Sequence, residues 1–176
     1  NSNSWGADSL KEHEEMIEFV NPAPLSAISY HKYPEGGVSA AANPSSVPDY
    51  LGIYDDWDGF MEYFVAQGKR LKKPVYLGET GYVYSNATAS DKETVLTMDK
   101  ILGVVQTIAD AAVKADLPLT LFWNYDDRPE YNPAQPNDKS SGTEWSWNER
   151  WEKGKGILEI IKKSNAAFEE KHAAAE

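Results

Sequence analysis

Hydrophobic residues along the chain recur at two spacings, one typical of amphipathic helices and one typical of buried strands. Three short apolar runs rich in strand-forming residues predict strands, namely LSAISYHKYP at 25–34, VYLGE at 75–79 and LTLFWNY at 119–125. Helical spacing predicts four helices around them. Their stripes are Leu10, His13, Ile17 and Val20; Trp57, Met61, Phe64 and Leu71; Val95, Met98, Leu102, Val105, Ile108 and Ala112; and Ile157, Ile161 and Phe168. The predicted order is αβαβαβα.

Local signals predict where several of these elements begin and end. Ser90 with Glu93 three residues later forms a capping box that would start the third helix. We expect the terminal helix to start after Gly154 and Gly156, because glycine disfavours helix. Residues 1–176 are expected to form a single unit, and residues 171–176 a frayed tail.

Alternating strands and helices predict a parallel sheet with right-handed crossovers. The predicted helix-to-strand connections are short, whereas the strand-to-helix connections are long, at 34 to about 56, 82 to 90 and 125 to about 153. Long polar loops after the carboxyl ends of parallel strands are typical of the active face of a TIM (β/α)8 barrel. Three strands cannot close a barrel, so the pattern predicts an α/β chain that forms part of one. A doubly wound sheet remains the alternative architecture.

Composition narrows the function classes. The 176 residues are 41% hydrophobic, which is enough for a sizeable core, and they carry a net charge of −11. Because such a surface repels phosphate groups, we expect no nucleic acid and no membrane as partner. Zero cysteines exclude disulfides and thiol catalysis. We expect no spanning helix and no signal peptide within these residues, although a signal peptide removed earlier would leave the same sequence.

Each predicted strand ends in residues that can act on a polar substrate. The first ends in His31 and Tyr33, the second in Glu79, and the third in Trp123, Asn124 and Tyr125. Parallel strands of a barrel direct these ends to one mouth, so residues far apart in sequence would converge there.

Glu79 stands between Gly78 and Gly81, which allow a ligand to approach the backbone closely, although a structural ion pair would also explain a carboxylate at this position. His31 and Tyr33 have structural explanations as a hydrogen-bonded core histidine and a packing aromatic. Trp123 offers an indole face on which a sugar can stack, or it belongs to the core. The group Asp126, Asp127 and Arg128 is expected to be a solvated loop or a local salt-bridge set.

These stretches resemble a family. YHKYP, LGETGY and LFWNY are similar to the sixth, seventh and eighth strands of the (β/α)8 retaining glycoside hydrolases that include the family 5 cellulases and mannanases. The resemblance implies that Glu79 is the nucleophile, that His31 and Tyr33 position it by hydrogen bonds, and that Trp123 is the stacking platform. Further substrate contacts are expected from Asn124, Tyr125, Tyr82, Trp145 and Trp147.

The resemblance also implies a second carboxylate that these residues lack. In that family the acid/base Glu follows an Asn at the end of the fourth strand, and no predicted strand here ends in Asn-Glu. Asn148-Glu149 has the dipeptide but lies in a tryptophan-rich loop after the last strand, so we interpret it as coincidence. The chain would then supply about the last three β/α units of a barrel. Its partner would be the N-terminal barrel half or a second copy, and its own activity would be weak or absent.

The prediction is therefore a retaining glycoside hydrolase acting on β-linked glucan or mannan, without cofactor or metal, in a secreted or extracytoplasmic location, with a cytoplasmic one left open. One alternative is an inactive half-barrel that binds glycans. Another is a metal-dependent barrel hydrolase with His31, Glu79, Asp126 and Asp127 as ligands, which the small number of histidines disfavours.

Overall fold

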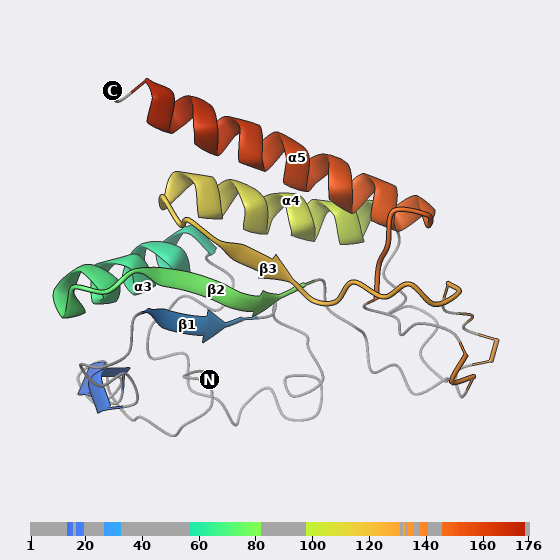
Figure 1. Ribbon diagram of the computed structural model, residues 1–176, viewed down its shortest axis with the longest axis horizontal. Helices are drawn as coiled ribbons and strands as arrows, with labels where there is room; N and C mark the ends of the chain where they lie inside the picture. Colours follow the sequence, from blue (N-terminus) through green and yellow to red (C-terminus); the bar gives the residue numbers. More distant parts are fainter. Residues whose placement is uncertain are drawn as a thin grey trace.

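The computed structural model describes a three-stranded parallel sheet and the helices that cover it (Figure 1). The described residues are 14–15, 17–19, 27–32, 57–81, 98–130, 132, 134–135, 138–140 and 146–174. The strands are β1 (Ile28–His31), β2 (Val75–Thr80) and β3 (Thr120–Phe122), in the spatial order β1-β2-β3. The helices are α3 (Trp57–Leu71), α4 (Met98–Lys114) and α5 (Glu152–Ala173). The parallel sheet predicted from the alternation is confirmed.

The three helices α3, α4 and α5 lie on the same side of the sheet (Figure 1). Ile28 and Tyr30 of β1 and Val75 and Leu77 of β2 point toward this layer and are buried in the main core cluster with side chains of α3 and α4. A second cluster joins α4 to α5. A doubly wound sheet carries helices on both faces, so the one-sided cover of the described elements favours the barrel.

On the other face of β3, apolar side chains are exposed to solvent. Leu121 and Trp123 are 46% and 47% exposed, whereas Phe122 between them packs against both core clusters. Successive side chains of a strand point to opposite faces, so one face of β3 packs on the helices and the other is exposed to solvent.

The connections have the predicted polarity. Residues 72–74 link α3 to β2, and residues 115–119 link α4 to β3. Positive φ angles at Lys72 and Asp116 turn the chain back within these short links. The strand-to-helix connections are longer, but residues 33–56 and 82–97 lie outside the described residues, and with them the capping box at Ser90. Within the first predicted helix, residues 14–15 and 17–19 are helical, and Ile17 is fully buried.

The predicted start of the last helix was wrong. Helix α5 begins at Glu152, so Gly154 and Gly156 lie inside it rather than before it. A Cβ at Gly154 would overlap the backbone carbonyl of Asn148, and one at Gly156 would press into the side chain of Leu102. These glycines allow close packing, and the contacts they permit outweigh their low helix propensity.

Helix α5 also continues through Lys171 and His172, into the segment expected to fray. Nζ of Lys171 donates to the carbonyl oxygens of Val113 (2.9 Å) and Lys114 (3.3 Å) at the end of α4. Both residues contact the Asp116 carboxylate, at 3.1 Å from Lys171 Nζ and 2.8 Å from His172 Nε2. Lysine on the last carbonyls of a helix is a known stabilising contact.

In the part of the chain that the structure describes, no helix combines the length and the apolar character needed to span a bilayer.

Candidate functional site

The carboxyl ends of the three strands meet at one edge of the sheet. His31 pairs with Glu79 across β1 and β2, and His31 Nδ1 lies 3.3 Å from Glu79 Oε2. The backbone N–H of Trp123 donates to the carbonyl oxygen of Thr80 (2.6 Å), which places the end of β3 beside the end of β2. Residues 31, 79 and 123 are thus neighbours, as expected for parallel strands.

A bulge in β2 decides where the Glu79 side chain points. Val75 and Leu77 face the helices, so strict alternation would direct Glu79 into the same layer. From Leu77 to Glu79, however, β2 advances two residues while β1 advances one, from Tyr30 to His31. From Leu77 to Thr80 it advances three while β3 advances two.

Strand β2 therefore carries one extra residue at 78–79 relative to both neighbours, which is the definition of a β-bulge. Thr80 takes the fully buried helix-facing position, and the Glu79 side chain stays 27% exposed beside His31. Burying an ionised carboxylate in the core would be costly, and the bulge instead keeps Glu79 at the partly exposed carboxyl edge of the sheet.

Gly78 fits this bulge because there is no room for a side chain. A Cβ at Gly78 would overlap Ser29 Oγ and lie 3.2 Å from His31 Nε2. We expect Gly78→Ala to lower the free energy of unfolding by about 1 kcal/mol, because Ser29 Oγ must change rotamer and His31 must shift away from Glu79. Urea unfolding would measure the first effect, and the nitrogen chemical shifts of His31 the second.

The control for Gly78→Ala is a second substitution that removes the obstructing atom. Ser29→Ala deletes Oγ without placing a glycine in β1, so the double variant Ser29→Ala/Gly78→Ala should regain part of the lost stability. If the single variant were as stable as wild type, or the second substitution gave no recovery, the packing explanation for Gly78 would fail.

Aromatic side chains gather beyond the end of β3. Trp123 and Tyr125 are 47% and 53% exposed. The Tyr125 ring meets Trp147 edge to face, with centroids 5.5 Å apart. Reciprocal backbone bonds hold this arrangement: Trp147 N–H donates to Asn124 O, and Asp126 N–H donates to Trp147 O, both at 3.0 Å. The peptide bond between Trp123 and Asn124 is cis.

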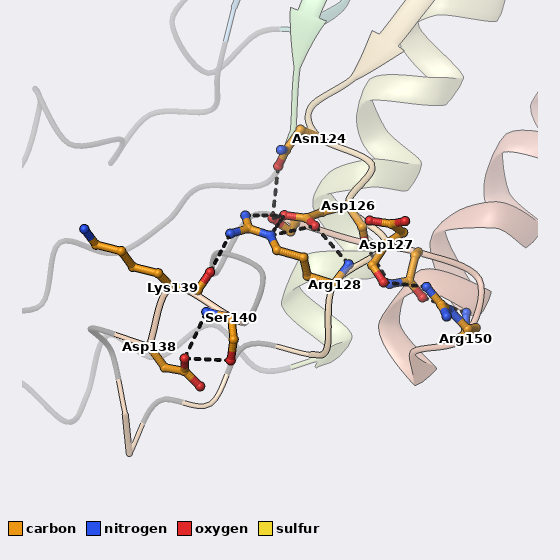
Figure 2. Close-up of polar contacts among 10 residues, drawn as sticks. Asn124, Asp126, Asp127, Arg128, Asp138, Lys139, Ser140 and Arg150 are labelled. Atoms are coloured by element: carbon orange, nitrogen blue, oxygen red, sulfur yellow. Dashed lines mark hydrogen bonds and ion pairs between the residues drawn. The ribbon is translucent and has the colours of Figure 1, made fainter.

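The loop after β3 is built around an ion pair between Asp126 and Arg128 (Figure 2). Arg128 donates to Asp126 through Nη2 (2.6 Å) and Nε (3.0 Å to Oδ1), and through Nη1 to the carbonyl oxygen of Lys139 (3.2 Å). Ser146 Oγ lies 3.2 Å from both Asn124 Oδ1 and Asp126 Oδ2. For this group either a solvated loop or a local salt-bridge set was expected, and the structure has an ion pair between Asp126 and Arg128. These contacts join residues 124–128 to residues 139 and 146.

This ion pair predicts a pH dependence of stability. Hydrogen bonds from Arg128 lower the pKa of Asp126 from 3.8 to about 2. A lowered folded-state pKa gives stability that is complete above about pH 4 and is lost as the pH falls toward 2. The Arg128 side chain is 44% exposed, so solvent screens the ion pair. We therefore expect the pair to contribute about 1 kcal/mol to the free energy of unfolding.

Urea unfolding of wild type and Asp126→Asn at pH 6 and pH 3 would measure this contribution. The difference between the two unfolding free energies should shrink by about half at the lower pH. Arg128→Leu should remove most of the same pH-dependent part while keeping the carboxylate, because only the backbone N–H of residue 128 and Ser146 Oγ would still donate to Asp126. A difference that stays constant between pH 6 and pH 3 would contradict the assignment.

The structure brings together His31, Glu79 and Trp123, and separately Asn124, Tyr125 and Trp147. Tyr33, Tyr82 and Trp145 lie outside the described residues. Within the described ranges, no group of three or more histidine, aspartate or glutamate side chains is arranged to hold a metal ion. Asp126, one of the ligands considered for a metal site, is engaged by Arg128.

Two features of the site escaped the sequence analysis. The first is the bulge at 78–79. Gly78 and Gly81, which flank Glu79 and Thr80 at the end of the strand, are a weak sequence signal for a bulge. The other is a hydrogen bond from Tyr125 Oη to Glu149 Oε2 (2.6 Å), between residues 24 positions apart.

No protein-family model matches the sequence, and no curated protein matches it. Solved structures do match. An endo-beta-1,4-mannanase from Thermotoga petrophila is similar with a TM-score of 0.50 and 14% identity, over 88% of this chain and 28% of the mannanase. A glycoside hydrolase family 5 mannosidase from Rhizomucor miehei is similar with a TM-score of 0.56 and 16% identity, over 89% of this chain and 42% of the mannosidase.

The chain thus spans less than half the length of either enzyme while nearly all of it is matched. The parallel sheet, the one-sided helices and the polarity of the connections agree with that partial match. The chain has the fold of part of a (β/α)8 barrel of the type found in glycoside hydrolase family 5.

Proposed function

We propose that this chain carries part of the active site of a retaining β-glycan hydrolase, with Glu79 as the nucleophile and β-linked glucan or mannan as substrate. The observation that carries the proposal is the bulge that turns Glu79 out of the core and sets it 3.3 Å from His31 at the carboxyl edge of the sheet. Bulges recur beside active sites because they re-aim a side chain at the end of a strand.

A retaining glycosidase uses one ionised carboxylate to attack the anomeric carbon, and a second carboxyl group roughly 5 to 5.5 Å away that first protonates the leaving oxygen and then activates water. In this proposal Glu79 is the first group. His31 Nδ1 is near enough to donate a hydrogen bond to Oε2, which holds the carboxylate in one orientation. Tyr33 is proposed as a second donor.

The second carboxyl group would come from the remaining barrel strands. In the same proposal this chain supplies about the last three β/α units, strands six to eight, and pairs with the N-terminal half of a barrel or with a second copy. Strand β3 forms one edge of the described sheet, and Leu121 exposes an apolar side chain there. A cavity of about 200 Å³ lies between β3, α4 and α5. A further strand would pair with the edge of β3, and a further helix would cover this cavity.

The substrate would lie along the exposed aromatic side chains after β3. An indole face suits stacking on a sugar ring, and Trp123 is half-exposed next to the end of β2. Tyr125, Trp147 and Asn124 would contact further sugar units, together with Tyr82 and Trp145. A glycan polymer as substrate is consistent with a secreted or extracytoplasmic location.

Binding without catalysis is the second candidate. The same half-exposed Trp123 and Tyr125 would hold a glycan with no second carboxyl group in reach. Affinity for an oligosaccharide that is unchanged in Glu79→Gln, with no turnover after the N-terminal half is added, would favour this function.

The test is incubation with 2-deoxy-2-fluoro β-glycosides that carry a good leaving group, in both gluco and manno forms. These reagents trap the glycosyl-enzyme without a strong general acid. Intact mass followed by peptide mapping is expected to find one added glycosyl group, on Glu79. Absence of an adduct with both reagents on the chain alone would mean that it does not form a competent site by itself. Absence after the N-terminal half is added would remove the nucleophile assignment and leave the binding function.

A further inference from the structure

The pair formed by Tyr125 and Glu149 has no evident task in the fold. Both side chains are exposed, and an exposed hydrogen bond of this kind contributes little to stability. Its geometry is nevertheless well defined, with 2.6 Å between Tyr125 Oη and Glu149 Oε2.

Hydrogen bonds of its two neighbours in the chain, the buried Asn148 and the exposed Arg150, hold Glu149 in place. Asn148 is fully buried and its Nδ2 donates to the carbonyl oxygen of Asp126 (2.7 Å). Its Oδ1 accepts from the backbone N–H of Arg150 (2.9 Å), and the Arg150 guanidinium donates to the carbonyl oxygen of Asp127. The Asn148-Glu149 dipeptide is therefore a structural anchor followed by a presented carboxylate.

We propose that Tyr125 and Glu149 form a sugar-binding subsite next to Trp123, in which the Glu149 carboxylate accepts hydrogen bonds from two neighbouring hydroxyls of one hexose unit of a β-linked glycan. The inference rests on the proposed function and adds to it a residue that selects among sugars. Tyr125 follows Trp123 by two residues, so their Cα atoms are at most about 7 Å apart, within reach of adjacent sugar units.

The charges suit this role. The hydrogen bond from Tyr125 lowers the pKa of Glu149, which keeps the carboxylate an acceptor at neutral pH. The same bond raises the pKa of Tyr125, so the phenol keeps its proton and remains a donor. Oε2 is held by the phenol while the carboxylate retains further lone pairs for ligand hydroxyls. The edge-to-face contact with Trp147 fixes the ring that sets this geometry.

The experiment is a tryptophan-fluorescence titration of the full chain with cellohexaose and with mannohexaose. Glu149→Gln and Tyr125→Phe should each weaken binding of the better hexasaccharide about tenfold, because each removes a partner of a charge-assisted hydrogen bond. The double variant should lose little more than either single variant, since the two residues act as a unit. Urea midpoints should stay at the wild-type value, which separates recognition from a structural role.

The matched control is Glu159→Gln, an exposed glutamate on α5 that pairs with Lys162 and should bind as wild type does. If Trp123→Ala loses binding while Glu149→Gln and Tyr125→Phe retain it, the subsite is refuted and the proposed function stands. If the wild-type chain binds neither hexasaccharide, the subsite and the glycan site are both refuted.

Discussion

Replacing Glu79 with glutamine is expected to abolish covalent labelling by the 2-deoxy-2-fluoro glycosides, with a loss of at least about 10³-fold in rate. The amide has nearly the same shape, but it is neutral and a poor nucleophile, so it cannot form the glycosyl ester. Replacing His31 with alanine should slow labelling without abolishing it, since that change removes a donor 3.3 Å from Oε2 and leaves the carboxylate in place. Mass spectrometry over a time course measures both.

Glu62→Gln is the matched control for this experiment. Glu62 is an exposed carboxylate on α3, beside Lys114, and its loss should leave the labelling rate unchanged. Labelling of Glu79→Gln at the wild-type rate would show that another residue is the nucleophile. Equal slowing in both variants would point to a general effect of charge on the reagent.

Replacing Gly154 with alanine is expected to destabilise the protein by about 2–3 kcal/mol, although alanine is the better helix former. Gly154 lies in the first turn of α5, where its Cα hydrogen faces the backbone of Asn148. A Cβ would overlap the Asn148 carbonyl, and backbone cannot move aside as a flexible side chain can. Moving Asn148 away from residue 154 would also disturb the hydrogen bond from Asn148 Nδ2 to the carbonyl oxygen of Asp126. Urea unfolding monitored by circular dichroism measures the change.

Gly103→Ala is the control with the opposite sign. Gly103 lies inside α4, and a Cβ there would meet nothing within 4 Å. The substitution should therefore stabilise the protein by about 0.5–1 kcal/mol through helix propensity alone. If Gly154→Ala were stabilising as well, the tight contact between α5 and residue 148 would not exist in solution.

The sequence alone predicted the order, type and polarity of the described elements. Periodicity placed α3 from Trp57 and β2 from Val75, which is where the structure begins them. These predictions succeed because burying one face imposes a period of 3.6 on a helix and of 2 on a strand. The third strand is shorter than predicted, because the apolar run 119–125 continues past Phe122 into the loop that exposes Trp123 and Tyr125.

The convergence of His31 and Glu79 at one edge of the sheet also followed from sequence, because parallel strands bring their carboxyl ends together. The direction of the Glu79 side chain did not follow. Alternation from Val75 and Leu77 points it toward the helices, and only pairing with both neighbouring strands reveals the extra residue. A bulge is a mismatch between two strands, so one strand read alone cannot specify it.

What the sequence determined by itself is thus the framework, a parallel β/α unit with polar groups at its strand ends. The tertiary structure decided the contacts between segments far apart in the chain, such as Gly154 on Asn148, Gly78 on Ser29 and Tyr125 with Glu149. Local periodicity reports which face of an element is buried. It carries no information on which atoms of a distant segment meet that face, because packing fixes those contacts only when the elements assemble.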